Sequence, residues 1–293
     1  MNQQLIIMKT KLTFILFLVF PVLLFSQTKN ARTPDEAVAL IKQNVTCTWA
    51  AQTVDTFKAG DPESDLKGIA VCMFADMDIL KQAVIKGCNF IITHEPVFYN
   101  HSDQTEAFLS DPVYKEKSEF IKKNGLVIFR FHDHIHMTRP DGISEGMIQK
   151  LELGQYAVNG SQTHFRLPEH TSLRGYATSL KEKFGMETIR IIGNPDLKFT
   201  KIGFMAGAPG GQRHIQMLAS GDVEVLIAGE ANEWETYLYA HDASLQGKKK
   251  AVIFLGHIKS EEAGMEYCAK WLQEFIKGVP VHFIENKPNF RTF

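Results

Sequence analysis

Histidine and carboxylate side chains follow directly on four apolar runs of the sequence, at positions where predicted strands end. A single such histidine is usually a hydrogen-bonded structural residue, but repetition at equivalent strand ends favours a functional site. In parallel α/β sheets, ligands bind beyond the carboxyl ends of strands, so we expect these side chains to meet. The residues concerned are His94, Glu95, His132, Asp133, His134, His136, Glu230, His257 and Glu261.

These donor types suit zinc, iron, manganese, nickel or cobalt, which bind imidazole and carboxylate ligands. His257 and Glu261 lie four residues apart at a predicted helix start, so both project from one helix face. His132 and His136 have the same spacing. The sequence leaves open which of His132, His134 and His136 binds a metal.

The adjacent His94 and Glu95 lie in a predicted loop, where they can point to two different ions. Five or more donors that include a bridging carboxylate can hold two ions about 3.5–4 Å apart. A water shared by two such ions ionises near neutral pH and attacks a phosphoryl group, an amide or a purine-ring carbon. Glu261 or Glu230 could then assist proton transfer as catalytic residues. The predicted metal ligands are His94, Glu95, His132, His136, His257 and Glu261.

Helices and strands alternate along the chain, which predicts an α/β fold with mainly parallel sheets. Thr33 and Glu36 form a capping box at the start of a helix over 34–44, and residues 45–66 are polar and irregular. The stretch 154–170 is also polar and is the candidate linker between two halves. Predicted strands cover 68–74, 89–93, 126–131, 199–206, 223–228, 251–255 and 281–284. Predicted helices cover 77–87, 113–124, 142–153, 172–184, 212–219, 232–241 and 260–277.

The first 26 residues have the layout of a secretory signal peptide. Lys9 and Lys11 precede an apolar run over 12–25, which is shorter than the roughly 20 residues that a membrane-spanning helix needs. Cleavage near Ser26 would lower the basic residues from 32 to 30 against 33 acidic ones, a net charge of −3. We therefore expect an exported protein, periplasmic or extracellular, without stable membrane insertion.

The composition is that of an ordinary globular protein. Of the 293 residues, 44% are hydrophobic and 22% are charged, enough for one large or two modest domains. Without a basic excess, a general nucleic-acid binder is not expected. None of the four cysteines is paired at metal-ligand spacing, and Cys72 and Cys268 are predicted to be buried free thiols.

Several motifs carry a family resemblance. Residues 89–98 are similar to an apolar strand followed by Ser/Thr-His-His-Pro-Leu, and residues 127–136 to a strand followed by His-x-x-x-Asp. Residues 255–261 are similar to Gly-His-Tyr-x-Thr-Glu, and residues 227–230 to a Thr-Gly-Glu turn. The chain thus resembles the Nif-three-like proteins, or GTP cyclohydrolase 1 type 2-like dinuclear metal-centre proteins, from about residue 33 to 285.

The resemblance implies two α/β lobes, 27–153 and 171–293, with two metal ions in the cleft between them. His94, His257 and Glu261 match ligand positions of the family, whereas Glu95 replaces its second histidine and His136 replaces its aspartate. Because this exchange keeps donor count and charge, the site is expected to persist. Members of the family form ring-like hexamers, so the resemblance also implies a homo-oligomer.

Three functions remain open from the sequence. The first is a metal-dependent hydrolase of an unknown small-molecule substrate, and the second is a non-catalytic metal-binding scaffold in the cell envelope. The third is an amidohydrolase-like barrel, in which residues 132–136 would be the His-x-His motif after the first strand. Such a barrel would need eight strand–helix units. A loop over 207–211 could cradle a phosphate or be a plain turn.

Overall fold

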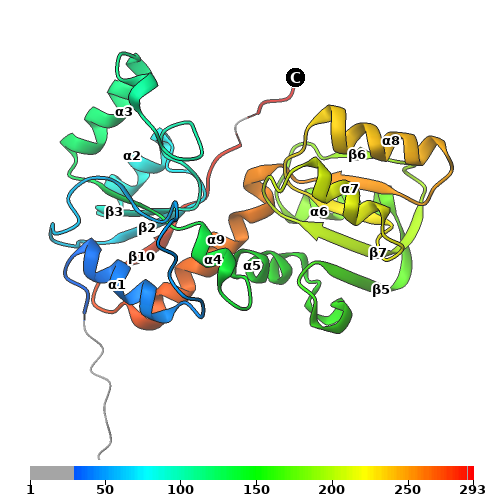
Figure 1. Ribbon diagram of the computed structural model, residues 1–293, viewed down its shortest axis with the longest axis horizontal. Coiled ribbons are helices and arrows are strands. Elements are labelled where there is room, and N and C mark those ends of the chain that lie inside the picture. Colours follow the sequence, from blue (N-terminus) through cyan, green and yellow to red (C-terminus); the bar gives the residue numbers. More distant parts are fainter. Residues whose placement is uncertain (1–29, 289) are drawn as a thin grey trace, which may run out of the picture.

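The computed structural model describes residues 30–288 and 290–293, so the predicted signal peptide lies outside the described residues. The strands form two separate five-stranded sheets, one in each of two lobes, with α4, α5 and α9 between them (Figure 1). This arrangement confirms the predicted α/β class and excludes the barrel. Within the described part of the chain, no helix has both the length and the apolar character to span a membrane.

The first sheet has the strand order β1-β4-β3-β2-β10, in which only the pairing of β1 with β4 is antiparallel. Every residue of β2, β3 and β4 is buried, as expected for parallel strands covered on both faces. The helix α2 joins the parallel strands β2 and β3 and confirms the predicted β-α-β unit. The strand bounds are β1 Phe57–Ala59, β2 Ile69–Cys72, β3 Phe90–Thr93, β4 Val127–Arg130 and β10 Val281–Phe283.

The second sheet has the order β5-β7-β8-β9-β6, with a parallel centre and an antiparallel strand at each edge. The stretch predicted as a linker contains much of β5, an edge strand that leaves several polar side chains exposed. That exposure explains why its sequence looks like a linker. The strand bounds are β5 His164–Ser172, β6 Arg190–Ile192, β7 Lys198–Met205, β8 Val225–Ala228 and β9 Ala251–Phe254.

The helices largely follow their predicted ranges. Thr33 accepts a hydrogen bond from the Glu36 amide at 3.2 Å, but the Glu36 carboxylate accepts from Arg32 rather than closing the box on Thr33. A π-helix, Glu233–Tyr237, precedes α8 where one continuous helix was predicted. The helix bounds are α1 Pro34–Asn44, α2 Met77–Ile85, α3 Pro112–Lys123, α4 Asp133–Met137, α5 Gly142–Leu151, α6 Leu173–Lys183, α7 Gly211–Ala219, α8 Leu238–Leu245 and α9 His257–Phe275.

The long helix α9 connects the two lobes. Its 19 residues span roughly 28 Å and return the chain to the first sheet, where β10 pairs with β2. The sequence had assigned residues 281–284 to the C-terminal lobe, because a hydrophobic pattern predicts a strand without naming its partner. The helix also begins at His257, three residues before its predicted start, so His257 and Glu261 occupy its first two turns.

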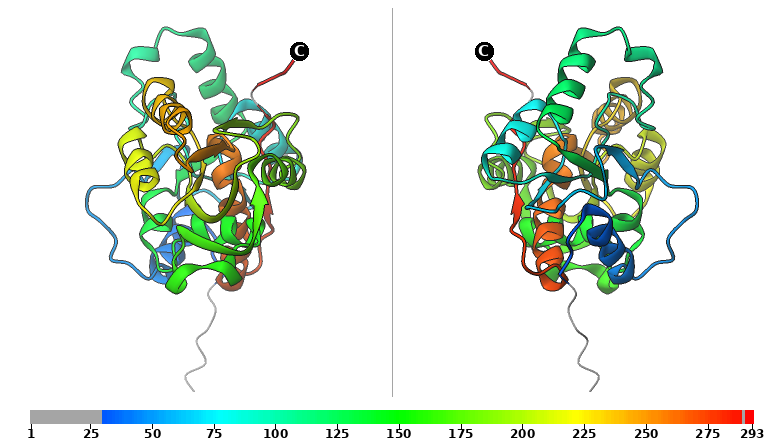
Figure 2. Two further views of the ribbon diagram at one scale, coloured as in Figure 1. Left: turned by 90° about the vertical axis from the view of Figure 1, so that its right-hand side faces the viewer. Right: turned by 90° about the vertical axis from the view of Figure 1, so that its left-hand side faces the viewer.

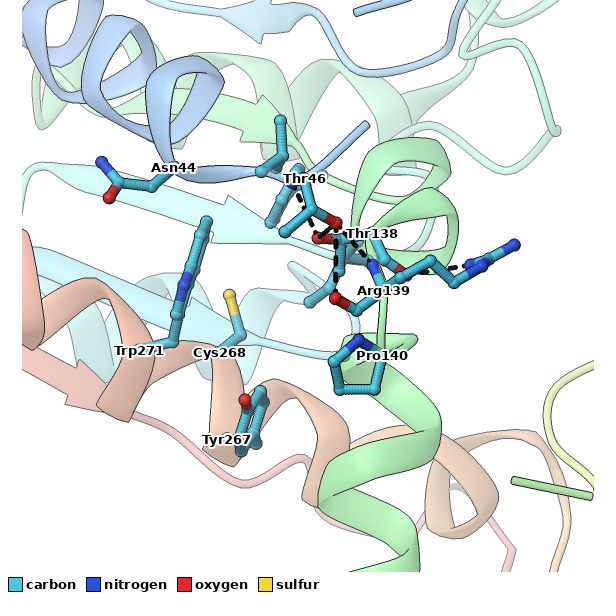
Figure 3. Close-up of a pocket in the computed structure, with 12 residues that line it drawn as sticks. Asn44, Thr46, Thr138, Arg139, Pro140, Tyr267, Cys268 and Trp271 are labelled. Carbon is cyan, nitrogen blue, oxygen red and sulfur yellow. Dashed lines mark hydrogen bonds between the residues drawn. The ribbon is translucent and has the colours of Figure 1, made fainter. Parts of the chain in front are cut away.

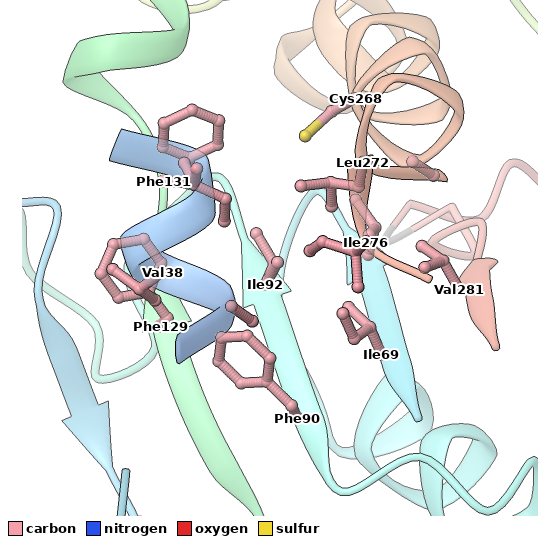
Figure 4. Packing of buried hydrophobic residues seen from close by; sticks show 14 of the residues in the cluster. Val38, Ile69, Phe90, Ile92, Phe129, Phe131, Cys268, Leu272, Ile276 and Val281 are labelled. Atoms are coloured by element: carbon pink, nitrogen blue, oxygen red, sulfur yellow. The ribbon is translucent and has the colours of Figure 1, made fainter. Parts of the chain in front are cut away.

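Hydrophobic packing fixes α9 against the first lobe. Leu272 of α9 and Val38 of α1 lie in the same buried cluster as Phe90, Ile92 and Phe129 of the sheet (Figure 4). The end-on views show α1 and α9 close together along one side of this lobe (Figure 2). The first turns of α9 are therefore carried on a rigid element.

A glycine contact sets the crossing of α9 with α5. A Cβ at Gly146 would collide with the backbone of Ala263, and a Cβ at Gly264 would collide with that of Ile143. Only glycine at both positions lets the two helices approach this closely. This crossing brings the start of α9 beside α4 and the start of α5.

The cysteines behave as predicted. Cys72 and Cys268 are fully buried, and all four cysteines, which lie within the described residues, are free. Burial raises the pKa of the Cys72 thiol to about 12, so this thiol is inert at neutral pH.

Candidate metal centre

Six side chains converge where the carboxyl ends of strands from both sheets face one another. His94 and Glu95 follow β3, and His132 and His136 follow β4 at the N-cap and within α4. The remaining two, His257 and Glu261, follow β9 at the start of α9. The structure therefore brings together all six residues that the sequence singled out as metal ligands.

Glu261 lies at the centre of this cluster. Its Oε2 is 3.2 Å from His257 Nε2 and 3.7 Å from His94 Nε2, and its Oε1 is 3.8 Å from His136 Nε2. The carboxylate is only 3% exposed. One buried carboxylate thus faces three imidazoles with both of its oxygens.

Glu95 forms the second carboxylate of the cluster. Its Oε1 is 3.3 Å from His257 Nε2 and 3.6 Å from His132 Nε2, while its Oε2 is 3.4 Å from Arg130 Nη2. Burial acts to raise the pKa of Glu95, but the hydrogen bond to His257 and the neighbouring charges outweigh it and lower the pKa. Glu95 is therefore an anion that presents one oxygen to the cluster.

The four histidines turn Nε2 toward the cluster and hold Nδ1 against an oxygen acceptor outside it. Since an oxygen without a proton can only accept, Nδ1 of each ring carries a hydrogen. In a neutral ring the lone pair is then on Nε2, which is the tautomer that binds metals. The acceptors are the Phe131 carbonyl for His94 (3.1 Å), Asp133 for His132 (2.9 Å), Asp141 for His136 (3.0 Å) and Glu230 for His257 (3.0 Å).

Two atoms of the cluster test whether a cation fits. Among the described residues His94 Nε2 is buried and has no hydrogen-bond partner, and Glu261 Oε2 faces it at 3.7 Å, beyond hydrogen-bond distance. Burial, together with the charges of His136 and His132, holds the pKa of His94 well below its usual value, so its ring stays neutral. A nitrogen lone pair left unpaired in the interior costs about 1–3 kcal/mol, which a bound cation would remove.

The negative charges of Glu95 and Glu261 also favour a cation in the cluster. Burial disfavours protonation of His257, yet hydrogen bonds to Glu261 and Glu95 raise its pKa to about 10. A proton thus occupies the space between the two carboxylates when no metal does. His94 with His132 and His136, and His94 with Glu95 and Glu261, each place ligand atoms within 4.8 Å of one another. The cluster could hold a metal ion.

The loop after β7 packs onto the cluster. Gly207 has φ +62°, and a Cβ there would collide with Glu261 Oε1. Its amide donates to Ser260 Oγ at 3.0 Å, and its carbonyl accepts from the Glu230 amide at 2.7 Å. Glycine at position 207 therefore allows Glu261 and Glu230 to pack closely against this loop.

His134 does not join the cluster. Its ring is fully buried, with Nδ1 2.6 Å from Asp55 Oδ2 and Nε2 accepting from the Ala50 amide at 2.9 Å. It also stacks on Trp49 at a centroid distance of 3.6 Å. His134 thus ties the 45–56 segment to α4. Of the three histidines that the sequence left open, His132 and His136 face the cluster.

Two acidic residues next to predicted ligands in the sequence have different contacts. Asp133 holds His132, whereas Glu262 bonds to Lys259 at 2.8 Å and to the Asn286 amide at 2.8 Å, away from the cluster. The sequence missed Asp141, which both orients His136 and caps α5 through Ser144. Its position one residue before a predicted helix is typical of a helix cap, but no sequence pattern indicates that it also orients His136.

Arg130 was also missed. Its side chain is fully buried, and it donates to the His94 carbonyl at 3.1 Å and to the His101 carbonyl while facing Glu95. Asp103 lies 3.8 Å away. The available signal was a charged residue within an otherwise apolar predicted strand, which is rarely buried without a partner.

A pocket of about 580 Å³ lies beside the cluster, and Glu95 and Glu230 form part of its wall. A second cavity of about 200 Å³ lies near the far end of α4 and is lined by Trp271, Tyr267 and Cys268, among others (Figure 3). The second cavity contains none of the six cluster residues. Glu95 belongs to both the larger pocket and the cluster, so a molecule in this pocket would lie next to the candidate metal centre.

Comparison with known proteins identifies the family. The family model described as Duf34/NIF3 (NGG1p interacting factor 3) matches residues 37–289. The chain belongs to the Duf34/NIF3 family. This result confirms the resemblance that the sequence motifs indicated.

Individual Duf34/NIF3 relatives are distant. A GTP cyclohydrolase 1 type 2 homolog from Clostridium acetobutylicum is 22% identical over 224 residues, covering 73% of this chain and 79% of the relative. The solved structure of a Staphylococcus aureus protein has a TM-score of 0.70 and 15% identity, covering 89% and 99% of the two chains. A Bacillus cereus protein related to NIF3 has a TM-score of 0.69 and 16% identity, covering 89% and 98%. At these identities the structural likeness shows the shared fold.

Proposed function

We propose that this chain is an exported dinuclear metal-dependent hydrolase. The observation that carries the proposal is the convergence of four imidazole Nε2 atoms on Glu95 and Glu261, with every Nδ1 held by an acceptor, beside a pocket of about 580 Å³. An ordinary structural histidine cluster would not orient all four lone pairs to one place.

The six residues would hold two divalent transition-metal ions such as zinc, iron, manganese or nickel. Glu261 would hold a metal together with the imidazoles of the cluster, because both of its oxygens face imidazole nitrogens. Such ions, when bound, polarise the group to be cleaved and make water nucleophilic near neutral pH. An open position on a bound ion would distinguish a catalytic site from a closed structural one.

Glu230 is the better candidate for proton transfer. Its Oε2 holds His257, its side chain is 63% exposed, and it lines the pocket. Glu261, which was the other candidate, turns both oxygens to imidazoles and is therefore assigned as a ligand. Glu230 would accept a proton at its second oxygen.

The test is a panel of phosphoester, carboxylic ester and amide substrates, assayed with each of the four metals and with a chelator. Turnover that the chelator abolishes and the metal restores is expected. Glu230→Gln is expected to lower kcat even at saturating metal, where any weaker metal binding through His257 is compensated, and Glu262→Gln, which alters a neighbouring carboxylate outside the cluster, is the matched control. Tight metal binding without chelator-sensitive turnover on any substrate would contradict the hydrolase and favour the metal-binding scaffold.

Export and assembly are part of the proposal. The basic pair and the apolar run before residue 26 support export, and family membership supports a homo-oligomer, with a hexamer as the expected size. Mass spectrometry of the protein isolated from its native host should find an N-terminus near residue 27, and light scattering should find a multiple of the chain mass. An intact residue 1 in the cytoplasmic fraction would refute export.

A further inference from the structure

The pocket beside the candidate metal centre contains a buried lysine. Lys117 of α3 is 4% exposed and forms part of the pocket wall. Its Nζ donates to the Val97 carbonyl at 2.7 Å and lies 5.3 Å from the ring centre of Tyr99. Within residues 30–288 and 290–293, no carboxylate oxygen lies within 4.0 Å of this Nζ.

A buried ammonium without an ion-pair partner is unusual. Lysine is almost never buried unless it is paired, and its three N–H groups here have one acceptor among the described residues. Burial lowers the pKa of Lys117 to about 8, while the more distant charges of Asp76, Cys72 and Asp103 act to raise it. The amine therefore remains largely protonated at neutral pH and lacks a counter-ion.

The carboxylates of the same wall are already engaged. Asp76 accepts hydrogen bonds from the Ile79 amide at 2.9 Å and from Asn286 at 3.0 Å. Glu95 faces Arg130 and two histidines, and Glu230 accepts from His257. Lys117 is thus a cation of this wall with no oppositely charged side chain within 4.0 Å among the described residues, which favours an anionic ligand group at its Nζ.

We infer that this pocket binds an anionic group of the substrate, a phosphate or a carboxylate, with Lys117 as its charge partner. The inference rests on the proposed hydrolase function and names its substrate class as an anionic ester or amide. Since Glu95 belongs to both the pocket wall and the cluster, a molecule paired with Lys117 reaches the candidate metal centre. Phe74 and Tyr99 provide aromatic surface for the rest of the molecule.

The experiment is calorimetric titration of the full mature chain with inorganic phosphate and with succinate, on metal-loaded and metal-stripped protein. Lys117→Met is expected to weaken binding of the preferred anion about tenfold or more in both forms, the loss of about 1.4 kcal/mol. Lys115→Met removes the same charge from an exposed position of α3 and should change the affinity less than about twofold. The anion that binds with the higher affinity identifies the anionic group of the substrate.

Lys117→Gln serves as a second variant, and thermal unfolding and elemental analysis check that both variants fold and keep their metal. Failure of metal-stripped wild-type protein to bind either anion with a Kd below about 10 mM would overturn the inference. So would unchanged affinity in both variants. Because binding is measured without turnover, failure here is distinct from failure of the hydrolase, which is judged by chelator-sensitive activity.

Discussion

Arg130→Met tests how the structure tolerates the negative charge of Glu95. The guanidinium is fully buried. It donates to the carbonyls of His94 and His101 and lies against the Glu95 carboxylate. Methionine preserves much of the volume but leaves these acceptors without a donor. Removing one partner of a buried ion pair costs about 3–5 kcal/mol. Asp103 keeps its ion pair with Lys58 at 3.5 Å, so the loss of stability comes from Glu95 and the two carbonyls.

The assay is thermal unfolding of metal-stripped protein, since a bound cation would stabilise Glu95 independently. For a domain of this size, each kcal/mol shifts Tm by about 2–4 °C, so the expected decrease is about 6–20 °C. Arg139→Met is the matched control, because Arg139 also donates to backbone carbonyls beside the cluster but is exposed to water. A decrease no larger than that of the control would refute the role assigned to Arg130.

Three further predictions concern the cluster and its pocket. Glu261→Gln should lower metal affinity by more than the roughly 10–100-fold expected for an outer partner, measured by chelator competition, whereas Glu262→Gln should bind like wild type. Asp141→Asn keeps the cap of α5 but weakens its hold on His136, so metal affinity should fall about 10–100-fold; an unchanged affinity would argue against His136 as an oriented ligand. Burial lowers the pKa of Lys117 from 10.5 to about 8, so between these values the folded chain binds fewer protons and the stability contributed by this group rises with pH. The stability advantage of Lys117→Met over wild type in metal-free, anion-free buffer should therefore shrink from about pH 7 to about pH 10, and an advantage independent of pH would contradict the lowered pKa.

The central strands and the cluster could be predicted because one physical pattern governs both. Parallel strands buried on two faces read as continuous apolar runs, and polar residues at their carboxyl ends must then be brought together by the topology. His94 after β3 and His257 after β9 are separated by 163 positions in the sequence, yet both face Glu261 in the structure. The four-residue spacing of His257 and Glu261 correctly placed both side chains at the start of one helix, α9.

Other features depend on tertiary contacts that no local pattern encodes. The edge strands β1, β5 and β6 are short or partly exposed, so they lack the apolar runs that marked the central strands. His134 resembles His132 and His136 in sequence, and only its bond to Asp55 and its stacking on Trp49 show that it points elsewhere. Asp133 is adjacent in sequence to His132, which it holds. The acceptors of His94, His136 and His257 lie 37, 5 and 27 positions away, and the folded structure is what pairs them with these rings.

Elemental analysis of the purified mature protein tests the dinuclear centre most directly, with His257→Ala and Glu95→Ala measured beside Glu262→Gln. We expect about two transition-metal ions per chain in wild type and in Glu262→Gln, and fewer in the two cluster variants. One ion or none per chain, unchanged by His257→Ala and Glu95→Ala, would contradict the dinuclear metal centre.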